Sequence, residues 1–132
     1  MLDPPQSGRG TEPRLVLIVD DDARNLKLAR DVLLADGLRT LLARTGAEAV
    51  ALGAKHLPDV ILMDLRLPDM DGAEAARILA DGARTAAIPV VALSAVAFEG
   101  DTAWLARAGF AGYLKKPIDV ESFPRRVRRF CA

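Results

Sequence analysis

The stretch VILMDLRLPDMDG, residues 60–72, runs from an apolar segment directly into a group of acidic and turn-forming residues. Four apolar residues lead into Asp64, and Pro68, two further aspartates and Gly72 follow it. A continuous apolar run of this length is typical of a strand that is covered on both faces, as in a parallel sheet. A carboxylate at the end of such a strand is costly unless another group compensates its charge. Asp64 is therefore either a chance strand-end residue or the centre of a site.

Apolar runs and helical patterns alternate on both sides of this stretch. The expected strands cover residues 15–19, 38–43, 59–64, 88–94 and 111–114, and the expected helices cover 23–37, 45–56, 71–80, 100–108 and 119 to the C-terminus. Apolar strands joined by helical crossovers, which are right-handed, predict an α/β fold with a doubly wound parallel sheet. We expect five strands and five helices in one domain.

Residues that favour helix ends support these boundaries. Thr45 with Glu48 three residues later, and Asp71 with Glu74, match the capping box that opens many helices. Gly37 follows the first helical pattern, where glycine commonly ends a helix. For the last helix we expect Asp119 to act as the cap, and Pro124 to delay or distort the start because proline lacks a backbone N–H.

Composition excludes several classes of function. The chain has 132 residues, 51% hydrophobic and 27% charged, with a formal net charge of zero, so no overall field favours nucleic acid or an anionic membrane. Cys131 is the single cysteine, which excludes a disulfide framework. Residues 1–13 contain three prolines and little that is apolar, so we expect a disordered tail before a folded domain at 14–132. We found no secretion signal or membrane segment, and expect the cytoplasm.

Polar residues follow several of the expected strands at their carboxyl ends. Asp20 and Asp21 follow the first, Asp64 ends the third, Ser94 ends the fourth and Lys116 follows the fifth. Doubly wound sheets bind ligands at this edge, where the strand order reverses. With the order 2-1-3-4-5, the reversal lies between the first and third strands, so the aspartates should meet there.

Crowded carboxylates repel one another and need a cation. No cysteine or histidine lies nearby, and oxygen ligands favour a hard cation such as Mg²⁺ over zinc. An ammonium, a hydroxyl and Mg²⁺ around one carboxylate are suited to stabilising phosphoryl oxygens. The carboxylate can itself be the nucleophile, which would give an aspartyl phosphate.

Four motifs together resemble the response-regulator receiver domains of two-component signalling, which have a flavodoxin- or CheY-like fold. The motifs are LIVDDD, ILMDLRLPDMDG, VVALSA and YLKKP, each at the end of an expected strand, and the resemblance spans about residues 14–131. The segments VDDDARN and IPVVALSAVAFEGD are similar to those of stand-alone, cell-cycle-type receivers.

This resemblance implies a phosphorylation site and its metal. Asp64 would be the phosphoacceptor. Asp20 and Asp21, with Asp64 and the backbone carbonyl of Arg66, would bind Mg²⁺, or Mn²⁺ as an alternative.

It also implies a switch. Ser94 and Tyr113 occupy the switch positions, Lys116 would contact the phosphoryl group, and the Lys116–Pro117 peptide would be cis. The phosphodonor would be a sensor histidine kinase or a histidine phosphotransfer protein. We expect no output domain, so an unidentified protein would receive the signal at the face of the fourth helix, fifth strand and fifth helix, without nucleic acid or membrane. Such a domain is a signalling phosphoacceptor rather than an enzyme.

Two alternative functions use the same residues. A degenerate receiver would bind a partner without being phosphorylated. A haloacid-dehalogenase-type phosphatase also uses a strand-end aspartate and Mg²⁺, but it needs a second aspartate two residues later, where this chain has Arg66.

Other polar residues have simpler interpretations. Asp22, Asp69 and Asp71 are expected to be turn or helix-cap residues. The run RRVRR at 125–129 could be a nucleic-acid patch, but is expected to be a solvated helix face near the negative end of the helix dipole.

Overall fold

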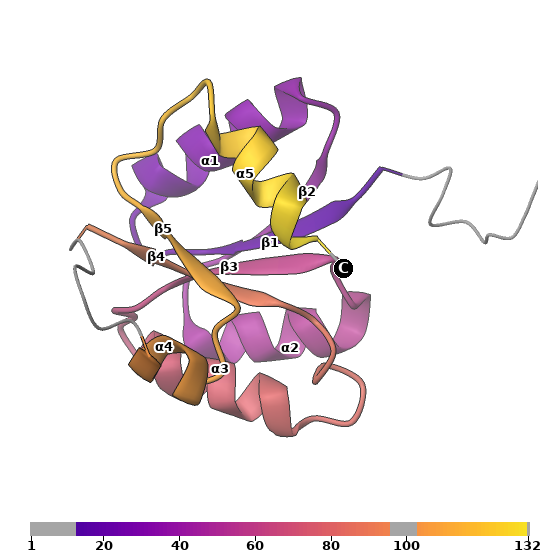
Figure 1. The fold of residues 1–132 in the computed structure, drawn as a ribbon, viewed down its shortest axis with the longest axis vertical. Coiled ribbons are helices and arrows are strands. Elements are labelled where there is room, and N and C mark those ends of the chain that lie inside the picture. The colour runs from indigo at the N-terminus through magenta and orange to yellow at the C-terminus, as the bar shows by residue number, and fades with distance from the viewer. Residues whose placement is uncertain (1–12, 96–102, 132) are drawn as a thin grey trace, which may run out of the picture.

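The computed structural model describes residues 13–95 and 103–131, and shows one parallel sheet with helices on both faces (Figure 1). The strands are β1 (Leu15–Val19), β2 (Arg39–Ala43), β3 (Val60–Asp64), β4 (Val90–Ser94) and β5 (Gly112–Lys115). The helices are α1 (Ala23–Ala35), α2 (Gly46–His56), α3 (Gly72–Asp81), α4 (Ala103–Arg107) and α5 (Phe123–Phe130). The strand order is β2-β1-β3-β4-β5, so the predicted fold class and order are confirmed.

Two predictions fall partly or wholly on residues that are not described. The expected disordered tail lies outside the described residues apart from Pro13, and so do residues 100–102 of the fourth expected helix. Among the described helices, none combines the length and the apolar character that crossing a membrane requires.

Alternate residues of each strand enter two separate cores, one on each face of the sheet. In β1, Val16 and Ile18 pack with residues of α1 and α5, whereas Leu17 and Val19 pack with residues of α2, α3 and α4. Figure 1 shows α1 and α5 over one face and the other three helices over the opposite face. All four side chains are at most 1% exposed. Burying a side chain of this size contributes about 1.5–3 kcal/mol, which explains why β1 contains no polar residue.

The ends of α1 follow the sequence prediction. The Asp22 carboxylate accepts a hydrogen bond from the Arg24 N–H at 2.8 Å, so Asp22 caps the helix. Gly37 has a φ of +88°, and the Leu38 N–H donates to the Leu33 carbonyl at 3.0 Å. This closing turn needs a left-handed residue, which explains glycine at this position.

Two further helix starts differ from each other. Thr45 caps α2 as predicted, because its hydroxyl accepts a hydrogen bond from the Glu48 N–H at 3.0 Å. Asp71 precedes α3, but its side chain makes no capping hydrogen bond, so the capping box predicted at Asp71 and Glu74 is wrong. The Glu74 N–H instead donates to the backbone carbonyl of Asp71 at 3.0 Å. The helix α3 therefore begins without a side-chain cap from Asp71.

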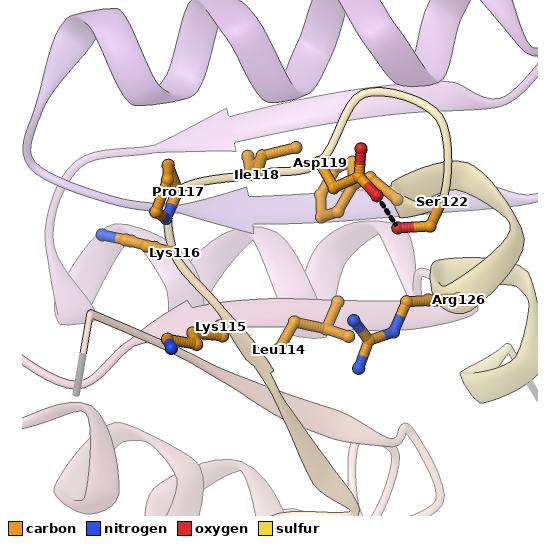
Figure 2. Close-up of a pocket in the computed structure, with 9 residues that line it drawn as sticks. Leu114, Lys115, Lys116, Pro117, Ile118, Asp119, Ser122 and Arg126 are labelled. Atoms are coloured by element: carbon orange, nitrogen blue, oxygen red, sulfur yellow. Dashed lines mark hydrogen bonds between the residues drawn. The ribbon is translucent and has the colours of Figure 1, made fainter. Parts of the chain in front are cut away.

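The last helix begins later than its predicted cap. Ser122, not Asp119, directly precedes α5, and Pro124 lies in the first positions of the helix, so the expected late start is confirmed and the cap assignment is wrong. Asp119 lies three residues before Ser122 and accepts its hydroxyl hydrogen bond at 2.7 Å (Figure 2). Pro124 lacks an N–H, and the first positions of a helix tolerate this.

Gly72 lets α3 begin directly against the end of β3. A Cβ atom at Gly72 would lie 2.3 Å from the Asp64 carbonyl oxygen and 2.9 Å from the Leu65 Cα. The Gly72 N–H donates to the Leu65 carbonyl at 2.9 Å. Because the obstructing atoms belong to the backbone, only glycine fits here.

We predict that Gly72→Ala destabilises the protein by about 1–3 kcal/mol, because the added methyl group would clash with backbone atoms that cannot move aside. Urea unfolding measures the loss. Gly53→Ala is the control, since a Cβ there would meet only side-chain atoms, of Leu79 at 3.1 Å and Ile61 at 3.5 Å. Equal stability of Gly72→Ala and the wild type would show that the backbone at Asp64 can move to make room for the methyl group.

Candidate functional site

Three carboxylates converge at the carboxyl ends of β1 and β3. These strands are neighbours, with Val19 beside Met63, so Asp20 and Asp21 follow β1 next to the place where Asp64 ends β3. The structure brings one oxygen of each carboxylate within 4.8 Å of the others. Asp20 is 1% exposed, Asp64 is partly buried and Asp21 is exposed. The meeting of the aspartates at the reversal of strand order is confirmed.

Lys116 places an ammonium group between two of these carboxylates. Its Nζ lies 2.7 Å from Asp20 Oδ2 and 3.2 Å from Asp64 Oδ2. The backbone N–H of Lys116 donates to the Ser94 carbonyl at 2.7 Å, which fixes the segment after β5 against the end of β4. The Lys116–Pro117 peptide is cis, as the family resemblance implied.

Backbone N–H groups hold the remaining oxygens of the two inner carboxylates. The Asp22 N–H donates to Asp20 Oδ1 at 2.9 Å, and the Arg66 N–H donates to Asp64 Oδ1 at 3.1 Å. Each of these carboxylates therefore has one oxygen on the Lys116 ammonium and the other on the backbone. Such charge-assisted hydrogen bonds are strong and directional, so both groups have a defined orientation.

Burial and neighbouring charges act in opposite directions on the site. Burial raises the pKa of Asp64, and the negative charge of Asp20 adds to this, while the Arg66 N–H and the Lys116 ammonium oppose it. Burial alone would lower the pKa of Lys116, but its hydrogen bond to Asp20 and the charges of Asp20 and Asp64 outweigh burial and raise it. Lys116 is therefore a permanent cation at neutral pH.

The donor set fits a divalent hard cation. When all three carboxylates are ionised, the single Lys116 ammonium leaves two formal negative charges uncompensated. Every candidate ligand in this cluster is a carboxylate oxygen, and Mg²⁺ prefers oxygen ligands. Asp20, Asp21 and Asp64 could therefore hold Mg²⁺, whereas the part expected of the Arg66 carbonyl stays a prediction.

Ser94 and Tyr113 lie on neighbouring strands and the same face of the sheet. Ser94 ends β4 and is 7% exposed. Tyr113 lies beside Ala92 in the register of β4 and β5, and it packs against the core on the side of α2, α3 and α4. Their placement is compatible with a switch, and that role stays a prediction.

Asp69 and Arg44 make contacts that their sequence positions do not predict. Asp69 was expected to serve its own turn, but its carboxylate accepts hydrogen bonds from Gly46 and Ala47, at 2.8 and 3.0 Å, at the start of α2. Arg44 Nη2 donates to the Asp21 carbonyl at 2.8 Å. Both contacts join segments more than twenty residues apart, so no local motif reveals them.

The basic run at 125–129 is a solvated helix face, as expected. Its four arginines are exposed, and Val127 alone is buried. Arg128 forms an ion pair with Asp36 at 2.8 Å, which joins α5 to the end of α1.

Sequence comparisons agree with this geometry. The family model described as "Response regulator receiver domain" matches residues 16–128. The polar-differentiation response regulator DivK of Brucella anthropi is 39% identical over 118 residues, which cover 89% of this chain and 96% of the relative. DivK of Brucella melitensis is also 39% identical, with 87% and 94% covered.

Solved structures are similar over the same region. The chemotaxis response regulator CheY4 of Vibrio cholerae has a TM-score of 0.83 and 25% identity, covering 89% of this chain and 98% of that one. The receiver domain of a sensor histidine kinase from Pseudomonas aeruginosa, which holds a magnesium ion in its active site cleft, has a TM-score of 0.80 and 32% identity, covering 89% and 97%.

These comparisons give the phosphatase alternative no support. The family model covers most of the chain, and its relatives match over nearly their whole length. The chain therefore belongs to the response regulator receiver domain family.

Proposed function

We propose that Asp64 accepts a phosphoryl group from a phosphohistidine of a sensor kinase or phosphotransfer protein, and that Asp20 and Asp21 bind the Mg²⁺ required for the transfer. The observation that carries the proposal is the position of Lys116, whose ammonium contacts both Asp20 and Asp64 in a cluster of three carboxylates. A purely structural ion pair needs one carboxylate, whereas this cluster keeps negative charge available for a metal.

The transfer forms a bond between an Asp64 oxygen and phosphorus while the bond from phosphorus to the donor's histidine nitrogen breaks. The electron pair of that bond stays on the imidazole. Bound Mg²⁺ would neutralise charge on the phosphoryl oxygens. Lys116 keeps its proton and supplies a second positive charge beside Asp64, and the Arg66 N–H keeps the carboxylate oriented for attack.

The output surface is proposed to be the face formed by α4, β5 and α5. A cavity of about 310 Å³ lies there between the segment after β5 and α5 (Figure 2). Lys115 and Arg126 line it and have no ion-pair partner among residues 13–95 and 103–131. These two cations outnumber Asp119, the carboxylate that also lines the cavity, and this supports an output partner that presents acidic groups to this face. Ser94 and Tyr113 would transmit phosphorylation to it.

With Mg²⁺ and a small phosphodonor, the wild type should gain one phosphoryl group that hydroxylamine removes, because an aspartyl phosphate is an acyl phosphate. Asp64→Asn should gain none, since the amide is not a nucleophile. Intact-mass analysis measures the gain. Asp71→Asn is the control, because it changes an exposed carboxylate of the same loop that makes no capping hydrogen bond. Equal labelling of Asp64→Asn would refute the assignment and leave the degenerate receiver as the alternative.

Mg²⁺ should raise the melting temperature, because a cation that binds only the folded state stabilises it, by about 2.7 kcal/mol at one hundred times Kd. Asp21→Asn should weaken Mg²⁺ binding, yet leave the metal-free protein as stable as the wild type or more so, since it relieves repulsion. Melting curves over a Mg²⁺ series test both effects. Asp81→Asn, an exposed change at the end of α3, is the control, and an unchanged Mg²⁺ response in Asp21→Asn would contradict the placement.

Ser94→Ala should still accept phosphate but should lose the coupled change at Tyr113, because no hydroxyl remains to donate to the phosphoryl group. A hydrogen bond to a charged group contributes about 1.5–3 kcal/mol, roughly ten- to a hundredfold in population. Tyr113 is the single tyrosine, so its NMR ring signals report the change without ambiguity. They should shift with a beryllofluoride mimic in the wild type and in Ser94→Thr. The same shift in Ser94→Ala would exclude Ser94 from the switch.

A further inference from the structure

The β1–α1 loop, which carries Asp20 and Asp21, and the β3–α3 loop, which follows Asp64, are both attached to one corner of the fold. This corner is residues 44–47, where β2 leads into the first residues of α2, and is called the β2–α2 turn below. Asp69 of the β3–α3 loop is bound by backbone N–H groups of this turn, and Arg44 of the turn is bound to the backbone of Asp21. We propose that the turn is a brace that positions the metal-binding carboxylates, with Asp69 and Arg44 as positioning residues. The inference rests on the Mg²⁺ site of the proposed function.

The Asp69 contact is suited to holding a loop in place. Both of its carboxylate oxygens are used, Oδ1 by the Gly46 N–H at 2.8 Å and Oδ2 by the Ala47 N–H at 3.0 Å. These N–H groups belong to the first residues of α2, where the helix dipole favours a negative charge. The same hydrogen bonds lower the pKa of Asp69, so the carboxylate stays ionised at neutral pH.

A second contact joins the same two segments. Gly46 is buried, and a Cβ atom there would lie 2.5 Å from Cγ and 2.6 Å from Sδ of Met70. Met70 is the residue after Asp69, so the tip of the loop both hydrogen-bonds and packs against the start of α2.

Anchoring the tip of the loop also affects Asp64, because the two ends of the loop are bonded to each other. Arg66 pairs with Asp71 in an antiparallel bridge, and the Gly72 N–H donates to the Leu65 carbonyl at 2.9 Å. The Arg66 N–H in turn donates to Asp64 Oδ1 at 3.1 Å. A loop closed in this way moves as a unit, so releasing its tip disturbs the hydrogen bond that orients Asp64.

Arg44 acts on the other side of the cluster. Its Nη2 donates to the Asp21 carbonyl at 2.8 Å, while its own backbone N–H donates to Glu48 Oε1 at 2.7 Å. The arginine is therefore held by α2 and in turn holds the segment after β1 that carries Asp20 and Asp21. One turn thus sets the position of the loops on both sides of the proposed metal.

The test compares Mg²⁺ affinity across variants of the full chain, measured by calorimetry without any phosphodonor. Asp69→Ala should weaken Mg²⁺ binding roughly tenfold or more, as loss of a group that orients metal ligands commonly does. The Arg66 amide should also exchange its hydrogen faster. Asp69→Asn keeps one acceptor oxygen and should give an intermediate affinity, which preserves the test if Asp69→Ala folds poorly.

Two controls remove the simpler explanations. Asp71→Ala deletes a carboxylate of the same loop that makes no capping hydrogen bond, so it measures the effect of charge alone. Val50→Ala deletes apolar packing of the same helix beyond residues 44–47, so it measures the loss of helix stability alone. Both should keep Mg²⁺ affinity within about twofold of the wild type, a change small beside the tenfold loss expected for an orienting group.

Arg44→Gln provides a further test, because the two explanations predict opposite changes in Mg²⁺ affinity. Removal of a cation near carboxylates should by Coulomb attraction alone tighten Mg²⁺ binding, whereas loss of the brace should weaken it. Weaker binding in both Arg44→Gln and Asp69→Ala supports the brace. If the wild type binds Mg²⁺ and both variants bind it as well or better, the brace is wrong. If the wild type does not bind Mg²⁺, the proposed function fails, and this inference fails with it.

Discussion

The ammonium of Lys116, held between Asp20 and Asp64, is the contact on which the site depends. It joins residues 96 and 52 positions apart in the sequence, so it ties the ends of β1, β3 and β5 together at one edge of the sheet. Removing one partner of a buried ion pair commonly costs about 3–5 kcal/mol, because the other charge is left uncompensated. The same contact therefore compensates charges that the fold partly buries, and it brings together the groups of the proposed chemistry.

The negative charge of the carboxylates at this edge of the sheet is only partly compensated, and this links the structure to signalling. Lys116 satisfies one oxygen of Asp20 and one of Asp64, while Asp21 remains exposed to solvent. In the proposed function, a divalent cation would bind beside the ammonium, and added phosphoryl charge would then meet two cationic groups. Lys116 directly follows β5 and is bound through its backbone to Ser94 at the end of β4, so it connects Asp64 to both strands.

Much of the fold and site could be predicted from the sequence because the decisive signals are local. The apolar run before Asp64 identified a doubly covered strand, and strand-end polarity located the acidic cluster. What the sequence could not reveal are contacts made across the fold. Asp69 looked like an ordinary turn residue, and only the packing of its loop on α2 shows its partners. The cap assigned to Asp119 failed for a related reason, since the preference for an acidic cap does not specify how long the preceding loop is.

The most direct test of the account is the Mg²⁺ affinity and metal-free stability of Lys116→Met. Methionine keeps most of the length and apolar surface of the lysine but removes the charge. We predict that the metal-free protein loses stability, because Asp20 and Asp64 become uncompensated, and that Mg²⁺ binds more tightly and restores more stability than in the wild type. Calorimetric titration with parallel urea unfolding measures both quantities. Unchanged stability together with unchanged Mg²⁺ affinity would contradict the claim that this ammonium and the metal compensate the same charges.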